Sequence, residues 1–195
     1  MYGEADTNPQ VDIVWHSVPF GHKDSYALQV LAQLLNGRTG RLYKGLVLGR
    51  QIATEAYATQ ISQKWAGCFH IHGEARDGHT PAEVELAIYE ELDKLRTEPV
   101  PPEELQKVKN NFAAYEYRKL SANMPILMQL LYYDGLGDWR AINENGPKYQ
   151  AVTAADVQRV VRKYFVKEAR SVATYTRKPA APQPEAGQSP KPHQP

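Results

Sequence analysis

The chain has 195 residues, of which 42% are hydrophobic and 10% aromatic, a composition that fits an ordinary globular protein with one core. Its 23 basic and 22 acidic residues leave a net charge of +1, which argues against a nucleic-acid partner or an anionic membrane surface. The single cysteine, Cys68, excludes an intrachain disulfide and leaves the redox compartment open. No apolar run approaches the about 18 residues of a transmembrane helix, so we expect no membrane span.

The first fifty residues predict one strand and two helices. Val11, Ile13 and Trp15 alternate with polar residues before Pro19, which is typical of a strand followed by a turn over residues 11–20. Two segments with apolar residues at helical spacing follow, and each has a glycine at its end. These predicted helices cover residues 23–36 and 41–49.

A pair of strands and a capped helix are predicted next. Residues 52–60 and 66–75 are rich in β-branched, aromatic and small side chains, which favours an antiparallel pair. Thr80 and Glu83 form a capping box with Pro81 at the first helical position. A helix with an apolar stripe from residue 84 to residue 95 is therefore expected here.

The remaining sequence predicts four further helices and a final strand. We expect the second of these helices to stop near Gly135 and the third to be interrupted or ended at Gly146-Pro147, because a proline lacks the N–H of the helical ladder. Thr153 with Asp156 predicts the start of the fourth. The predicted segments are helices over residues 105–115, 124–133, 139–152 and 154–164, and a strand over residues 170–176.

This order of elements predicts an α+β fold, a mostly antiparallel sheet with helices packed on one face. We assign residues 1–177 to this domain. From Lys178 onward, six prolines occur in 18 residues without a large apolar side chain. Such a segment cannot bury enough surface to order itself, so residues 178–195 are predicted to be a Pro-rich flexible tail.

Several catalytic motifs are missing from the sequence. None of the six histidines has the spacing of a helical zinc-hydrolase motif, and neither a G-x-S-x-G elbow nor the Gly-Lys-Ser/Thr of a phosphate loop occurs. Cys68 is interpreted as a small buried hydrophobe rather than a nucleophile, because no activating group is evident beside it. We therefore predict no catalytic residue in this chain.

The segment GCFHIHGEAR places His70, His72 and Glu74 on one face of a strand, since side chains alternate along a strand. Phe69 and Ile71 should face the helices on the other side. Two imidazoles at this spacing can share a zinc or copper ion, but a stable site needs a further ligand from a neighbouring strand, for which Glu55 is a candidate. We favour a polar sheet face that contacts a partner or an extended peptide, with a metal site as the alternative.

A resemblance to the insulinase (pitrilysin-like) zinc metallopeptidase family, which includes mitochondrial processing peptidase, covers residues 11–176. It is carried by the ordered series VDIVWHSVPFGHKDSYALQVLAQLLNGRTGRLYKGLV, QIATEAYA, AGCFHIHGEAR, TPAEVELAIYEELDKL, PPEELQKVKNNF and VTAADVQRVVRKYF. The family's working unit is a pair of homologous α+β domains, of which the N-terminal one carries an inverted zinc motif, H-x-x-E-H. That motif is absent here, so the chain resembles the second, non-catalytic domain, which closes a chamber over the zinc and presents a sheet face to the substrate.

This resemblance implies a partner and a substrate. The partner would be a homologous zinc-bearing domain or subunit, either fused in one chain or separate, and the substrate would be a peptide. No cofactor is expected in this chain, because the zinc would belong to the partner half. Alone, the chain should be inactive, although it would be part of a zinc metalloendopeptidase. A periplasmic or secreted parent protein is favoured by the proline-rich tail.

The resemblance also suggests substrate-binding residues. Many second domains of the family carry an arginine and, seven residues later, a tyrosine, which hydrogen bond the substrate or stabilise the transition state. Counted from the Arg-Leu-aromatic turn at residues 41–43, these positions fall at Val47 and Thr54, so both are lost. Arg50 and Tyr57 have the same spacing after a shift of three residues; otherwise Arg50 caps a helix and Tyr57 packs in a strand. The candidate substrate-binding residues are Arg50, Tyr57, His70, His72 and Glu74.

The family domain usually opens with a further strand before residues 11–18, and we find no such strand in the sequence. An uncovered sheet edge can pair with a second copy of the chain, which would give a homodimer. Three functions stay open: a substrate-binding half of a zinc peptidase, a stand-alone metal-binding protein that uses His70, His72 and Glu74, and a structural subunit like the core proteins of respiratory complexes.

Overall fold

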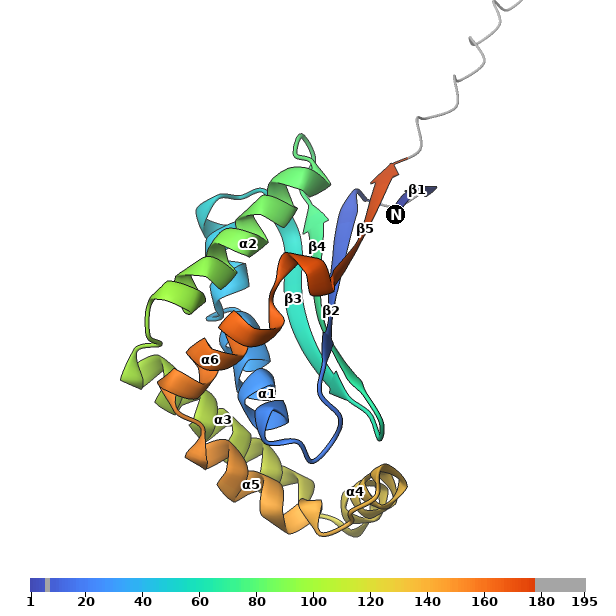
Figure 1. The fold of residues 1–195 in the computed structure, drawn as a ribbon, viewed down its shortest axis with the longest axis vertical. Helices are drawn as coiled ribbons and strands as arrows, with labels where there is room; N and C mark the ends of the chain where they lie inside the picture. Colours follow the sequence, from blue (N-terminus) through green and yellow to red (C-terminus); the bar gives the residue numbers. More distant parts are fainter. Residues whose placement is uncertain (6–7, 178–195) are drawn as a thin grey trace, which may run out of the picture.

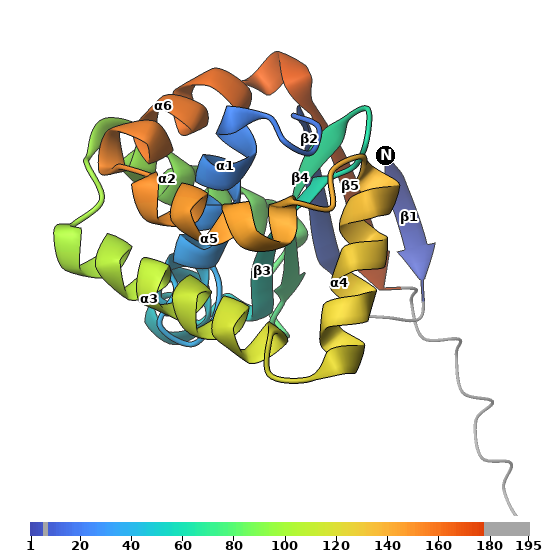
Figure 2. The same cartoon turned by 90° about the horizontal axis from the view of Figure 1, so that it is seen from below.

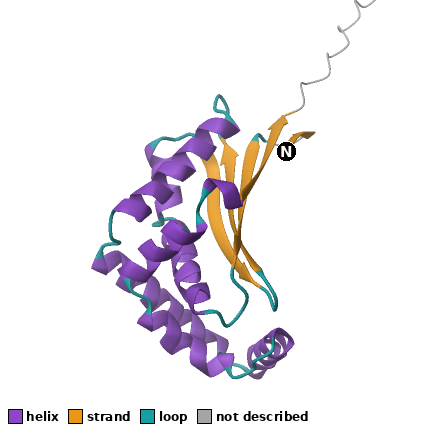
Figure 3. Cartoon of the chain, in the orientation of Figure 1, coloured by secondary structure: helices purple, strands orange, loops and turns teal. Residues whose placement is uncertain are grey.

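The computed structural model describes residues 1–5 and 8–177, which form a sheet with helices packed on one of its faces (Figures 1 and 3). The predicted tail at residues 178–195 lies outside the described residues. The strands are β1 (Tyr2–Ala5), β2 (Gln10–Ser17), β3 (Ala53–Ser62), β4 (Gly67–Ala75) and β5 (Arg170–Arg177). The helices are α1 (Lys23–Leu35), the π-helix η1 (Tyr43–Gly49), α2 (Pro81–Thr97), α3 (Pro102–Lys119), α4 (Asn123–Leu136), α5 (Ala141–Ala151), α6 (Ala154–Tyr164) and the 3-10 helix η2 (Lys167–Ala169).

The strands lie in the order β1-β5-β2-β4-β3. Only the β1–β5 pair is parallel, and every other neighbouring pair is antiparallel. The last strand along the chain is thus inserted between the first two. The prediction of an α+β fold with a mostly antiparallel sheet is confirmed.

The core lies between the sheet and the helices α1, α2 and α6. Trp15 of β2 and Phe69 of β4 are almost fully buried and both contact the ring of Phe165, at centroid distances of 5.0 and 4.8 Å. Ile71 is completely buried beside them, so the predicted inward direction of Phe69 and Ile71 is confirmed. Each large apolar side chain buried in this way contributes about 1.5–3 kcal/mol to folding.

Two helix starts follow from local sequence alone. The Thr80 hydroxyl accepts the N–H of Glu83, and the Glu83 carboxylate accepts the N–H of Thr80, which confirms the predicted capping box of α2. Thr153 and Asp156 form the same reciprocal pair at the start of α6. Each such cap is worth about 1 kcal/mol.

A strand precedes β2, contrary to the prediction from sequence. Tyr2–Ala5 forms β1, which pairs with β5 and covers the edge that was expected to be open. Four residues are too few to show alternation, and their partner strand is some 170 positions away along the chain. The edge at which a second copy of the chain was expected to pair is therefore covered by β1 of the same chain.

Of two predicted helix ends, that of α4 near Gly135 is confirmed and that of α5 is wrong. Helix α4 ends at Leu136, and its C-cap is Gly137, whose φ of 115° only a glycine adopts readily and whose N–H is bonded to the carbonyl of Tyr133 at 3.0 Å. Helix α5 continues through Pro147 without interruption. The proline removes one ladder bond, to the carbonyl of Asn143, and this residue is exposed to water.

Helix α4 stands apart from the other helices, beyond the lower end of the sheet in Figure 1. Seen from below, it lies in front of the end of the sheet (Figure 2). Of the helices in the described part of the chain, none is long and apolar enough to cross a membrane.

Candidate functional site

The face of the sheet opposite the main helical layer presents polar side chains from three adjacent strands. Tyr57 of β3 lies opposite His72 of β4, which in turn lies opposite Asp12 of β2. His70 is the next outward residue of β4. We call Asp12, Tyr57, His70 and His72 the histidine cluster.

Asp12 is the centre of the histidine cluster. One of its oxygens, Oδ1, lies 2.8 Å from Nε2 of His70 and 2.9 Å from Nδ1 of His72. Burial opposes ionisation of this carboxyl, but the hydrogen bonds with His72 and His70 outweigh burial and hold the pKa of Asp12 below its ordinary value. An ionised carboxylate only accepts hydrogen bonds, so both imidazoles donate to it.

The bonds to Asp12 use one nitrogen of each imidazole. In the neutral form of each ring, the other nitrogen, Nδ1 of His70 or Nε2 of His72, is an acceptor. Both side chains retain some exposure, 24% and 12%. Backbone N–H groups of an extended peptide are suitable donors.

Tyr57 adds an apolar surface to the cluster. Its ring stacks on His72 at a centroid distance of 4.9 Å and meets His70 edge-on at 6.1 Å. The residue is 38% exposed. Burial, with the charges of Asp12 and Glu55, raises the pKa of the Tyr57 hydroxyl, so it stays protonated and can donate a hydrogen bond.

Glu74 lies on the same face but does not join the histidines. Its Oε1 accepts hydrogen bonds from Thr54 Oγ1 at 2.7 Å and Asn8 Nδ2 at 2.8 Å, and these bonds lower the pKa of the Glu74 carboxyl. Glu55 is the partner of Glu74 in the register and is exposed. Over residues 1–5 and 8–177, no group of three or more His, Cys, Asp or Glu side chains is arranged to hold a metal ion. Glu74 bonds Asn8 and Thr54 whereas both imidazoles bond Asp12, so the proposed ligand set of His70, His72 and Glu74 is not brought together.

The shifted Arg50–Tyr57 pair is not brought together. Arg50 follows η1 and forms an ion pair with Glu90 of α2, on the side of the sheet that the helices cover. At the unshifted positions, Val47 is buried and Thr54 hydrogen bonds Glu74. The role of Arg50 in substrate binding stays a prediction.

Sequence reasoning missed Asp12. Its place between Val11 and Ile13 shows that it points outward, but only the register of β2 against β4 reveals that it meets both histidines. Cys68 is half-buried on the same open face, so its interpretation as a buried residue is wrong.

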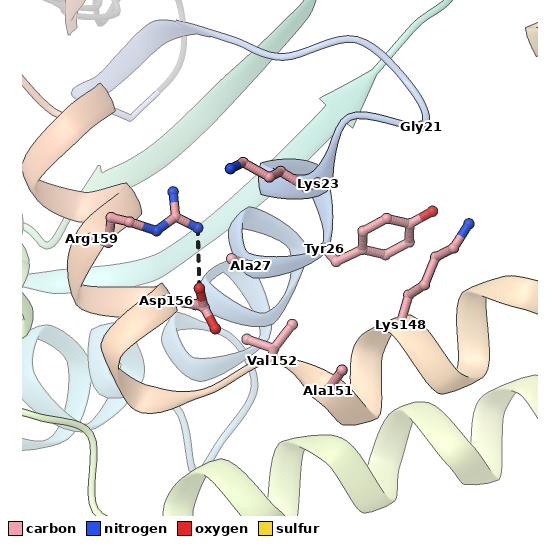
Figure 4. Close-up of a pocket in the computed structure, with 9 residues that line it drawn as sticks. All are labelled: Gly21, Lys23, Tyr26, Ala27, Lys148, Ala151, Val152, Asp156 and Arg159. Atoms are coloured by element: carbon pink, nitrogen blue, oxygen red, sulfur yellow. Dashed lines mark hydrogen bonds and ion pairs between the residues drawn. The ribbon is translucent and has the colours of Figure 1, made fainter.

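A cavity of about 450 Å³ lies elsewhere, between α1, α5 and α6 (Figure 4). Lys23, Lys148 and Arg159 line it above an apolar floor that includes Tyr26. Arg159 is paired with Asp156 at 3.2 Å, and Lys148 is paired with a glutamate of its own helix at 2.7 Å. Because carboxylates already balance most of this positive charge, the cavity has little preference for an anion.

The sheet with helices on one face defines the class of the protein, an α+β domain of the processing-peptidase-like metallohydrolase fold. A family model described as the peptidase M16 inactive domain matches residues 2–112, and the chain belongs to this family. The comparison with curated proteins gives no match.

Solved structures share the fold at low sequence identity. A protease from Helicobacter pylori is 20% identical with a TM-score of 0.85, over 92% of this chain and 43% of that one. An inactive peptidase domain from Bordetella parapertussis is 21% identical with a TM-score of 0.80, over 91% and 97%. A chain of complex III2 from Candida albicans is 15% identical with a TM-score of 0.75, over 91% and 45%. The chain thus spans less than half of the Helicobacter and Candida chains.

Proposed function

We propose that this chain is the non-catalytic domain of a zinc metallopeptidase that binds peptide substrate and closes the reaction chamber. The zinc would lie in a homologous domain or subunit that carries the H-x-x-E-H motif. Membership of an inactive-domain family and the absence of this motif from the sequence support the proposal. The observation that carries it is the histidine cluster on the open sheet face, which offers acceptors and an aromatic surface to an extended chain.

Peptide contact is assigned to two kinds of group. Nδ1 of His70 and Nε2 of His72 would accept backbone N–H groups, and the Tyr57 ring would pack against a substrate side chain. Glu74 would extend the same surface as an acceptor beside Thr54. The outer edge of β3, the last strand in the sheet order, is where an extended peptide can add as a further strand.

A binding experiment tests this assignment. A fluorescently labelled extended peptide of mixed sequence should bind the purified chain weakly. Tyr57→Ala or His72→Ala should raise the dissociation constant about fivefold, which corresponds to the loss of about 1 kcal/mol of binding free energy. Tyr117→Ala is the matched control, because Tyr117 is 79% exposed on α3, in the helical layer. Equal effects at Tyr57 and Tyr117 would contradict the assignment.

A second experiment tests the absence of catalysis. The chain is incubated with zinc and a library of quenched fluorogenic peptides, and no turnover is expected. Reproducible cleavage that both a chelator and His70→Ala abolish would overturn the proposal.

A structural role is the second candidate, favoured by the likeness to a chain of complex III2. The two functions differ in the partner that they require. Co-purification with a protein containing H-x-x-E-H would support the peptidase role, whereas a stable assembly without such a protein would support the structural one.

A further inference from the structure

Helix α4 has two apolar faces, and only one of them is covered. The inner face packs against the start of α5 in a small separate core through Ile126, Leu130 and Tyr133. The outer face carries five large apolar side chains that are 48–65% exposed: Met124, Leu127, Met128, Leu131 and Tyr132. A helix that is apolar all round is normally buried on all sides.

The exposed face has the spacing of a helix–helix seam. Met124, Leu127, Leu131 and Asp134 follow one another at intervals of three, four and three residues, which places them in one stripe. The five large apolar side chains on this face are about half-exposed or more, and a contiguous exposed apolar patch is typical of interaction sites. A pair of single helices forms a small contact, so we expect a weak, concentration-dependent interface.

The charges on α4 are complementary to an antiparallel copy of the same helix. Asp134 is the only charged residue of α4 and lies near its C-terminus, where the helix dipole disfavours an anion. The N-terminus of α4 begins after Ala122 without a side-chain cap. In an antiparallel pair, Asp134 of each copy lies beside the uncapped N-terminus of the other, so both unfavourable ends are compensated.

We propose that two copies of this chain associate through their α4 helices, packed antiparallel about a two-fold axis. Such an interface is self-complementary, because each residue of the stripe meets the stripe of the second copy. Gly135 lies at the edge of the stripe, and a Cβ placed there would meet nothing within 4 Å. The bare backbone at this position permits close approach of the second helix. This inference does not depend on the proposed peptidase role.

Sedimentation of the purified chain over a range of concentrations tests the proposal. We expect a monomer–dimer equilibrium, and Leu131→Glu should raise the dissociation constant at least about tenfold by placing two carboxylates in the apolar seam. Leu86→Glu is the matched control, because Leu86 is 59% exposed on α2 and Leu131 is 60% exposed on α4. A monomer at all concentrations, or equal effects of the two substitutions, would overturn the proposal.

The antiparallel arrangement has its own test. In a Cys68→Ser background, chains with Met124→Cys are mixed with chains carrying Asp134→Cys under mild oxidation. Antiparallel pairing brings position 124 of one copy near position 134 of the other, so a covalent dimer should form on mixing and much less with either variant alone. Crosslinking of Met124→Cys with itself would indicate parallel pairing and contradict the geometry.

Discussion

Asp24 is a charged side chain with no exposed surface, held in the first turn of α1. It accepts hydrogen bonds from Tyr164 at 2.7 Å, Arg159 at 2.8 Å and Lys163 at 3.2 Å. Burial alone would raise its pKa, but these donors outweigh burial and lower the pKa of Asp24 to about 2. This residue ties the start of α1 to α6.

The Asp24 cluster predicts a pH-dependent component of stability. Because the pKa falls from 3.8 to about 2 on folding, the ionised group contributes stability above pH 4 that is lost as the pH falls towards 2. The shift corresponds to about 2 kcal/mol. Urea unfolding at pH 7 and at pH 2.5 measures how much free energy of unfolding is lost on acidification, and this loss should be smaller for Asp24→Asn than for the unchanged chain. An identical loss of free energy in both proteins would contradict this role of Asp24.

Gly73 of β4 is a position where any side chain would collide with the core. A Cβ there would lie 2.6 Å from Cγ1 of Val84 and 3.4 Å from Cδ1 of Ile88, both on α2. Gly73→Ala should therefore destabilise the fold by about 1–3 kcal/mol, measured by urea unfolding. Gly135→Ala, measured at a concentration where the chain is monomeric, is the opposite control, since the position is open and helical and the substitution should stabilise the monomer by about 0.5–1 kcal/mol. If both substitutions changed the free energy of unfolding in the same direction, the packing argument would be refuted.

Among the elements, α4 is attached to the rest of the molecule by a small core of its own. Tyr133, Ala141 and Ile142 form this core, with Phe20 stacked on Tyr133 at 5.7 Å. The main core, in contrast, spans the sheet and the helices α1, η1, α2, α3 and α6. Local opening requires less free energy where fewer apolar contacts are lost.

Hydrogen exchange should separate these two regions. We expect amides of α4 to exchange through local opening, with protection factors at least about tenfold below those of β2 and β4. Mass spectrometry of peptides from α4 and from the central strands measures the difference at low protein concentration, where dimers are sparse. Equal protection in both regions would show that α4 belongs to the main folding unit.

Helices with local signals could be predicted from sequence, and elements with distant partners could not. The capping boxes at Thr80 and Thr153 fix helix starts through contacts three residues apart. The end of α4 was predicted near Gly135 and lies at Leu136, because glycines close to the end of an apolar run are also a local signal. Strand β1 was missed because its partner is β5, at the other end of the chain.

At the scale of the whole molecule, the same distinction applies to the site. Alternation correctly predicted that His70, His72 and Glu74 share a face, because this follows from a single strand. Which of them act together depends on the neighbouring strands: Asp12 joins the two histidines, whereas Asn8 and Thr54 draw Glu74 away. The alternation of side chains within one strand does not determine its register against the neighbouring strands.

The insertion of β5 between β1 and β2 has a consequence for biosynthesis. During synthesis β1 and β2 leave the ribosome first, and β5, which joins them, leaves last. The sheet therefore stays divided between β1 and β2 until nearly the whole domain has been made. Pairings between such remote segments form slowly, since the entropy of closing a large loop is lost before the hydrogen bonds of the pairing can form. Premature stops shortly before residue 170 should thus yield chains with an open gap in the sheet, prone to capture by chaperones or proteases.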